Sequence, residues 1–372
     1  MPEIENHLGT LRQKRGISAA QLARTVGVTR QTIYAMEAGS YVPNTAVALR
    51  LAQALEVKVE DLFALPEAEP AGLRSEEATL LPGSEALHPG QPVQLCRVNK
   101  RLVASPPSPV PWYFPVSDAV VASKLPKNGR TDVQVFDAAD DFRNRVLIAG
   151  CDPGISVLAH HLQSAGVELV LAHRNSSQSL KLLKDGCVHI AGTHLRDESS
   201  GESNLPEIAR MFPRNAVAVV TFAVWEEGIV TAAGNPKNIK AIDDLARRDI
   251  TIVNREKGAG SRALLDSALK RLKIDSKSVR GYERIAPGHL QAAWQVQAGQ
   301  ADCCIATRAA ARVFGLGFIP LLSERYDLAI RRQHLDMPSI QTLLDTLNRS
   351  NYRRELESLG GYDTRAAGQR LL

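Results

Sequence analysis

Residues 8–63 read LGTLRQKRGISAAQLARTVGVTRQTIYAMEAGSYVPNTAVALRLAQALEVKVEDLF, and this stretch decides the N-terminal fold. Ser18 is a favourable helix N-cap, and Gln21 follows three residues later, as in a capping box. The pattern predicts a short helix over residues 19–25 that breaks at Gly27, because glycine accepts the left-handed backbone of a helix end.

A second helix is predicted directly after this turn. Thr29 is its N-cap, and Gly39 ends it. Ile33 and Met36 stand three residues apart, so they share the face that packs into a core. A further helix over about 45–55 repeats apolar residues at core spacing.

The same segment is basic. Between residues 12 and 36 it has no acid and five cations: Arg12, Lys14, Arg15, Arg24 and Arg30. Such a surface neutralises phosphates, although the whole domain is near neutral. Two short helices around a tight turn match the geometry in which the second helix enters the major groove of DNA.

The pieces QLARTVGVTRQTIYAMEAG and LRLAQALEVKVEDLF resemble the XRE family, the Cro and phage-repressor type of helix-turn-helix protein. The resemblance implies a double-stranded DNA operator as partner, bound by a symmetric dimer with half-sites about one helical turn apart. It also implies an ion pair between Arg12 and Glu37. The implied DNA-binding residues are Arg15, Thr29, Arg30, Gln31, Thr32 and Tyr34. A helical interaction module that binds no DNA is the alternative.

Composition sets the limits on the rest of the chain. The 372 residues allow two or three domains, and the net charge of +5 does not by itself indicate DNA binding. No CxxC spacing occurs, so we expect neither a metal site nor a disulfide framework, and a reduced cytoplasm fits. The five cysteines are Cys96, Cys151, Cys187, Cys303 and Cys304. We expect no signal peptide and no membrane segment, since the longest apolar stretch, 216–225, is too short.

We divide the chain into four parts. They are a helix-turn-helix domain (1–66), a linker rich in Ala, Pro and Glu (67–79), a small β-rich adaptor (80–145) and an α/β domain (146–372). The adaptor contains the strand-like PVQLCRVNKRLVAS and a proline-broken stretch with Trp112, Tyr113 and Phe114. These aromatic residues form an interface patch or, as the preferred interpretation, pack against the next domain.

From residue 146 apolar strands alternate with helices, which predicts a parallel sheet covered on both faces. Two such blocks, about 146–222 and 223–316, would form two lobes, and residues 317–372 would return to the first. Two long strands would join the lobes.

The ordered motifs DPGISVLAHHL, VHIAGTHLRD, IVNREKGAGSRALLDSAL and GHLQAAWQVQAGQADCCIATRAAA resemble type II periplasmic-binding-protein domains, the kind related to molybdate-binding proteins. The resemblance covers about 146–365 and implies a two-lobed α/β fold with a ligand in the cleft. The expected fold class is therefore multidomain: an all-α helix-turn-helix domain, a β-rich adaptor and a periplasmic-binding-protein-like C-terminal domain.

Loops at the carboxyl ends of the predicted strands should line the cleft. The sharpest is REKGAGSR (255–262), whose glycines and helix N-terminus favour an anion. The resemblance implies molybdate or tungstate as effector, and we expect no cofactor. The candidate ligand-binding residues are Asp152, Gly154, Ser156, Asn175, Ser176, Ser177, Thr193, His194, Arg255, Gly258, Gly260, Ser261, Arg262 and His289.

Several of these residues have a purely structural alternative. Gly258 and Gly260 would then only permit a tight turn, Ser156 and Ser177 would cap helices, and Arg262 would pair with another side chain. The charge of the two arginines would also suit a larger organic anion.

The leading hypothesis is a cytoplasmic, ligand-responsive transcriptional regulator. One alternative is a constitutive repressor whose C-terminal domain only oligomerises, and another is a receptor that feeds a membrane permease. An enzyme is not expected, because the sequence has no nucleophile elbow, Walker loop, metal-ligand cluster or acid pair in register.

Overall fold

The structure is a computed structural model, and it describes residues 5–64, 74–83, 87–107, 116–122, 129–137, 142–197 and 201–372. The chain forms two compact units, Met1–Gly72 and Leu73–Leu372, which we describe separately. Residues 67–73 of the predicted linker lie outside the described residues, as do the three aromatic residues Trp112, Tyr113 and Phe114.

The N-terminal unit is a small helical bundle. Its helices are α1 (Leu8–Lys14), α2 (Ala19–Val26), α3 (Arg30–Glu37), α4 (Thr45–Leu55) and α5 (Val59–Leu62), and its strands β1 (Glu5–Asn6) and β2 (Phe63–Ala64) pair antiparallel. The predicted capping box of Ser18 and Gln21 is confirmed, and Gly27 ends α2 in the left-handed conformation. Ile33 and Met36 are fully buried in the core of this unit, as their spacing predicts.

The second unit begins with a closed five-stranded barrel. Its strands are β3 (Arg74–Leu80), β4 (Pro92–Val98), β5 (Arg101–Ser105), β6 (Ala119–Val121) and β7 (Arg130–Val135). Strand β3 begins inside the predicted linker 67–79, which corrects that boundary. Its charged side chains give it the composition of a linker, but backbone pairing with β7 holds it in the barrel, and it buries Ala78.

The barrel shares a hydrophobic core with the first lobe of the α/β domain. Cys96 and Val98 of the barrel pack in one cluster with Leu147 of the lobe. Arg145 forms an ion pair with Asp118 at 2.6 Å and donates a hydrogen bond to the Leu95 carbonyl at 3.1 Å. Since these contacts are buried, the barrel is anchored on the first lobe.

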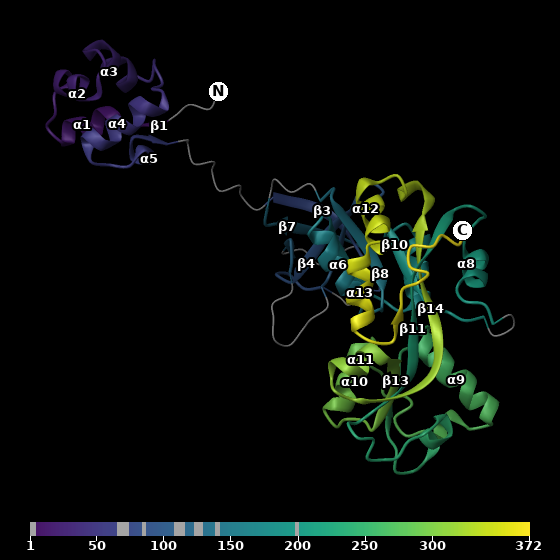
Figure 1. Ribbon diagram of the computed structural model, residues 1–372. Coiled ribbons are helices and arrows are strands. Elements are labelled where there is room, and N and C mark those ends of the chain that lie inside the picture. The colour runs from purple at the N-terminus through teal and green to yellow at the C-terminus, as the bar shows by residue number, and fades with distance from the viewer. Residues whose placement is uncertain are drawn as a thin grey trace. The chain divides into compact units, whose positions relative to one another are not determined.

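The α/β domain has two lobes joined by two long strands, β11 (Val217–Thr231) and β14 (Gly317–Arg331) (Figure 1). Lobe I contains β8 (Arg145–Gly150), α6 (Ile155–Gln163), β9 (Glu168–His173), α7 (Ser176–Lys184), β10 (Ile190–Thr193), α8 (Leu205–Met211), η3 (Arg332–His334), α12 (Pro338–Leu347), α13 (Ser350–Ser358) and β15 (Tyr362–Asp363). Lobe II contains η1 (Ile242–Ala246), β12 (Ile252–Val253), α9 (Gly260–Leu272), η2 (Ser276–Ser278), α10 (His289–Gln297), β13 (Cys303–Thr307) and α11 (Arg308–Val313).

The sheet is mixed, which corrects the predicted parallel sheet. Its strand order is β12-β13-β11-β14-β10-β8-β9, with β15 paired to β11. Among the described strands of this sheet, the parallel pairings are those within β10-β8-β9 and between β12 and β13. Strands β11 and β14 are antiparallel because the chain enters lobe II along β11 and returns along β14. The predicted lobe boundary at 222/223 therefore falls within β11.

Each lobe buries its own apolar side chains, in clusters that line the two faces of the sheet. Within the described ranges, no helix is both long enough and apolar enough to cross a membrane.

Candidate functional site

Helix α3 presents the predicted DNA-reading side chains to solvent. Arg30, Gln31 and Tyr34 are exposed on the face opposite the buried Ile33 and Met36. The Arg30 guanidinium lies 5.3 Å from the centre of the Tyr34 ring and donates a hydrogen bond to its hydroxyl at 3.1 Å. This contact orders two long side chains on the surface that would face DNA.

Helix α3 is held in place by a side-chain cap at its N-terminus and by an ion pair to α1. The Thr29 hydroxyl caps α3 by accepting from the Thr32 amide at 3.1 Å. Arg12 and Glu37 form the ion pair that the family resemblance implies, with 2.5 Å between Nε and Oε1, and it ties α1 to α3. Arg15 is exposed and pairs with Glu56 at 3.3 Å, so its guanidinium is shared with a neighbouring carboxylate.

The second candidate site lies where the two lobes meet, and we call this closed, buried junction the cleft. Lobe I contributes the loops that follow β8, β9 and β10, and lobe II contributes the loop after β12 and the first turn of α10. These are carboxyl ends of parallel strands and helix N-termini, the places where ligands bind in open α/β sheets. Strands β11 and β14 run from one lobe to the other (Figure 1).

The two lobes touch across this cleft. Asn175 donates a hydrogen bond to the Lys257 carbonyl at 3.2 Å. A Cβ atom at Gly260 would come within 2.5 Å of His194 Nδ1 and 2.7 Å of the His194 carbonyl oxygen. Gly258 has a φ of +91° and lies against Asn175 and Ser177. Both glycines therefore allow the loop after β12 to approach lobe I closely.

A sulfur and two imidazoles meet in the cleft. Cys151 Sγ lies 3.6 Å from His194 Nε2 and 4.0 Å from His289 Nε2. His194 Nδ1 is 2.9 Å from an oxygen of Glu324, which orients its ring. The aromatic ring of Trp225 stands against both imidazoles, with ring centres 4.8 and 5.0 Å apart. All of these side chains are buried.

Two carboxyl groups from the long strands lie beside this cluster. Glu227 of β11 is fully buried and accepts a hydrogen bond from the Ser261 hydroxyl. Burial, reinforced by the charge of Glu324, raises the pKa of Glu227 to about 8. Burial also raises the pKa of Glu324, on β14, to about 7. Both groups therefore lie close to the balance between charged and neutral forms near neutral pH.

Arg255 supplies positive charge to the same region. Its side chain is only 1% exposed and pairs with Glu256 at 3.2 Å. Burial, together with the charge of Arg255, lowers the pKa of His289 well below its usual value and that of His173 to about 4. These two imidazoles are therefore neutral and keep a lone pair for a hydrogen bond or a metal.

Asp152 is buried just beyond the end of β8. Its Oδ1 accepts hydrogen bonds from the Gly154 amide at 2.7 Å and the Tyr362 hydroxyl at 2.6 Å. Burial raises the pKa of Asp152 to about 7. Gly154 packs against Tyr362 and Leu356, where a Cβ would clash, so its role there is packing.

Other predicted residues have structural partners. Ser156 is exposed and donates to the Pro153 carbonyl, which places it outside the buried cluster. Thr193 donates to Asn204, and Ser176 accepts from the His194 amide. Arg262 donates to the Arg255 carbonyl, lies 3.7 Å from Asp266 and stacks on Tyr282.

Sequence reasoning missed several residues of the cleft. They are Cys151, His173, Trp225, Glu227, Glu324 and Tyr326, the last of which accepts a hydrogen bond from the Cys151 amide at 3.2 Å. Two of them could have been found from the sequence, because they are charged residues in apolar strands. Glu227 interrupts a long apolar run, and Glu324 precedes another. A charged residue in a buried strand needs a partner or a ligand.

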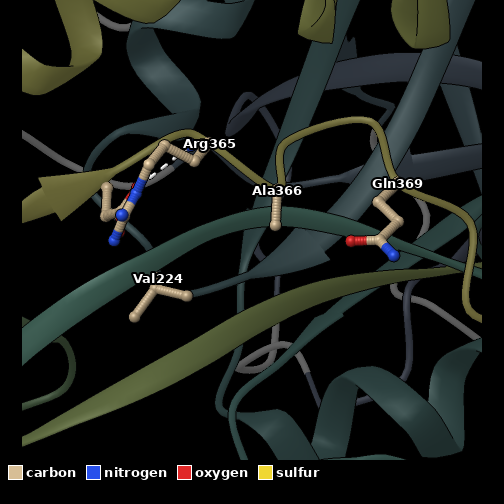
Figure 2. A pocket seen from close by; sticks show the side chains of 5 residues that line it. Val224, Arg365, Ala366 and Gln369 are labelled. Atoms are coloured by element: carbon tan, nitrogen blue, oxygen red, sulfur yellow. Dashed lines mark hydrogen bonds and ion pairs between the residues drawn. The ribbon is translucent and has the colours of Figure 1, made fainter.

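A separate hollow lies over β11 and the C-terminal segment (Figure 2). Val224, Asp363, Arg365, Ala366 and Gln369 line it. Arg365 pairs with Asp363, and its side chain is 89% exposed, so its charge is already balanced at the surface. The residues that line this hollow do not include the buried polar side chains of the cleft.

Two family models match the chain. Residues 8–62 match a helix-turn-helix, and residues 159–348 match a PBP superfamily domain. The uncharacterized protein YvgK of Bacillus subtilis (strain 168) is 34% identical over 258 residues, which cover 69% of this chain and 81% of that protein. The uncharacterized HTH-type transcriptional regulator YgzD of the same organism is 45% identical over 64 residues, 17% of this chain and 97% of that protein.

Solved structures similar to the chain include binding proteins. A putative phosphate ABC transporter substrate-binding protein with bound phosphate from Clostridium perfringens has a TM-score of 0.45 and 14% identity, over 59% of this chain and 98% of that one. The sulfate-binding protein SubI from Mycobacterium tuberculosis H37Rv has a TM-score of 0.44 and 16% identity, over 59% and 86%.

Proposed function

The chain belongs to the PBP superfamily and has an XRE-type helix-turn-helix domain at its N-terminus. On this basis we propose that it is a transcriptional regulator whose affinity for operator DNA changes when a small ligand binds between the two lobes. A regulator of this kind acts where the chromosome is, so the proposal includes a cytoplasmic location. It assigns binding to the cleft, and turnover of a bound compound would contradict it.

One observation carries the ligand-binding half of the proposal. Within the described part of the chain, the buried polar atoms around the cleft that have no hydrogen-bond partner include Asp152 Oδ2, Trp225 Nε1, Glu227 Oε2, Arg255 Nη1 and His289 Nδ1. A buried polar group without a partner costs about 1–3 kcal/mol. A ligand that pairs with several of these atoms would recover that free energy, and it could do so only while the lobes are closed.

The DNA-binding half is supported by the surface of α3. Arg30 and Gln31 are exposed side chains at the start of this helix, and they suit bidentate contacts to guanine and adenine edges. We propose that the chain binds its operator as a homodimer, because helix-turn-helix operators present two half-sites about one helical turn apart.

A population shift would link ligand binding to DNA binding. A ligand can favour the closed lobes only by binding them more tightly than the open lobes. The operator affinity then changes by the same coupling free energy, and by reciprocity DNA alters the affinity for the ligand.

For the ligand we propose a small oxyanion, with molybdate and tungstate as the first to test. The support is Arg255 and the N-terminus of α9, where Gly258 and Gly260 let backbone amides approach an anion. The raised pKa values of Glu227 and Glu324 keep a share of these groups protonated, so that they can donate hydrogen bonds to oxyanion oxygens.

The test is a calorimetric titration of the purified full-length chain with molybdate, tungstate, sulfate and phosphate. Tight binding of the first two would support the oxyanion. Operator sites would be selected from a random DNA library, and their affinity measured with and without each anion. Failure to select any specific DNA would contradict the regulator, whereas specific DNA binding with no response to the four anions would contradict only the oxyanion.

A further inference from the structure

The cleft brings together three side chains with the chemistry of a metal site. Cys151 follows β8, His194 follows β10, and His289 is the first residue of α10. One ligand atom from each lies within 4.8 Å of the other two. His194 and His289 are 43 and 138 positions away from Cys151 in sequence, so no local spacing pattern predicts the group.

The distances fit a tetrahedral metal ion. Zinc bonds of about 2.3 Å to sulfur and about 2.0–2.1 Å to nitrogen, at a tetrahedral angle, place the two atoms about 3.6 Å apart. Cys151 Sγ and His194 Nε2 are 3.6 Å apart, and Cys151 Sγ and His289 Nε2 are 4.0 Å apart. The second pair needs only a small inward movement of one side chain toward the other.

The outer contacts also suit a metal site. His194 Nδ1 is 2.9 Å from Glu324, so its Nε2 is left to face Cys151. A carboxylate on the far nitrogen of a metal-binding histidine fixes the ring and its tautomer. Glu227 is fully buried, its Oε1 lies 4.0 Å from His289 Nδ1, and its Oε2 has no partner among the described residues. Glu227 therefore lies on the outer nitrogen of His289, as Glu324 lies on the outer nitrogen of His194.

We propose that the cleft binds a divalent transition-metal ion of the zinc and cobalt type through Cys151, His194 and His289. Cys151 and His194 belong to lobe I and His289 to lobe II, so the bound ion holds the lobes closed. The inference rests on the proposed function in one respect, that the ligand site lies between the lobes. It adds a metal ion to the site in which the oxyanion is proposed to bind.

The test uses Co²⁺ as the probe on chelator-treated, reduced full-length protein. One equivalent should bind with a near-ultraviolet thiolate-to-cobalt absorption band and the visible bands of tetrahedral cobalt, and Zn²⁺ should displace it. Cys151→Ser should abolish the thiolate band. Glu324→Gln should weaken binding about 10- to 100-fold while the band remains, because Glu324 positions His194 without touching the ion.

The matched control is Cys187→Ser, which alters a buried cysteine of lobe I that is not in the cluster. It should bind Co²⁺ like the wild type, and thermal unfolding should show that each variant folds. The proposal is wrong if the wild type shows no thiolate band, or if the band persists in Cys151→Ser. Binding of molybdate without Co²⁺ binding would also overturn it. Operator selection on the same preparation tests the regulator separately.

Discussion

Replacing Gly260 with alanine should hold the two lobes of the ligand-binding domain apart. The glycine begins α9 in lobe II and faces His194 of lobe I. An added Cβ would stand 2.5 Å from His194 Nδ1 and 2.7 Å from the His194 carbonyl oxygen. The ring can rotate, but the carbonyl belongs to the backbone, so the clash is relieved mainly by opening the cleft.

The size of the effect follows from these distances. Both lie well inside the 3.4 Å at which ordinary contact begins, and the shortfall at the carbonyl oxygen is 0.7 Å. Overpacking of this kind costs about 1–3 kcal/mol. Because the cost falls on the closed state alone, the ratio of open to closed protein should rise roughly 5- to 150-fold.

The rate at which the Cys151 thiol is labelled can measure this opening in the ligand-free protein. Its side chain is at the centre of the cleft and only 3% of the residue is exposed. A thiol reagent should therefore reach it mainly through the open state, and its labelling rate, followed by mass spectrometry, should rise by the same factor in Gly260→Ala. Cys187, which is 7% exposed and outside the cleft, provides an internal standard.

Two controls accompany the measurement. Ala263→Ser changes an exposed position on the same helix and should label like the wild type. Thermal unfolding should show that Gly260→Ala still folds, with a midpoint lowered by no more than the cost to the closed state explains. If Cys151 labels at the wild-type rate in Gly260→Ala, the reasoning about closure is refuted.

Three further outcomes are expected. Gln31→Ala should weaken binding to the selected operator by about 1–3 kcal/mol in a fluorescence titration and leave the affinity of the cleft for its ligand unchanged. If the variant binds the operator as tightly as the wild type, Gln31 does not contact a base. Arg12→Met should lower the free energy of unfolding of the N-terminal unit by roughly 2 kcal/mol in urea, because it leaves the Glu37 carboxylate unpaired, and adding Glu37→Met should restore part of that loss. Burial and the neighbouring His334 lower the pKa of His189 to about 3, from an unfolded value near 6.5. The contribution of the neutral ring to stability is therefore fully present above pH 6.5 and is lost as the pH falls toward 3. The free energy of unfolding should fall by about 1.4 kcal/mol for each pH unit, and the urea midpoint of His189→Asn should depend less on pH between about pH 6 and 4. If the midpoints of the variant and the wild type change in parallel, this histidine is not the cause.

Local sequence signals were sufficient for the helix-turn-helix unit. The capping box at Ser18, the glycine after α2 and the three-residue spacing of Ile33 and Met36 all act within one or two turns of helix. The strands and helices of the α/β domain were equally visible, because alternation of apolar runs with amphipathic helices is also a local property.

Strand direction and strand pairing were decided only by the tertiary structure. Whether β11 and β14 run parallel or antiparallel depends on the path of the intervening residues through lobe II, and no short pattern encodes that path. Strand β3 was missed for a similar reason: its partners β5 and β7 come later in the chain, and its own composition is that of a polar loop.

By itself, then, the sequence determined the two domain families, the exposed face of α3 and the loops that border the cleft. The tertiary structure decided which side chains meet there. Cys151, His194, Glu227, His289 and Glu324 come from five separate segments of the chain, and closure of the lobes places them in one buried cluster. Their chemistry arises from that proximity and from the loss of water around them, two properties that no single stretch of sequence carries.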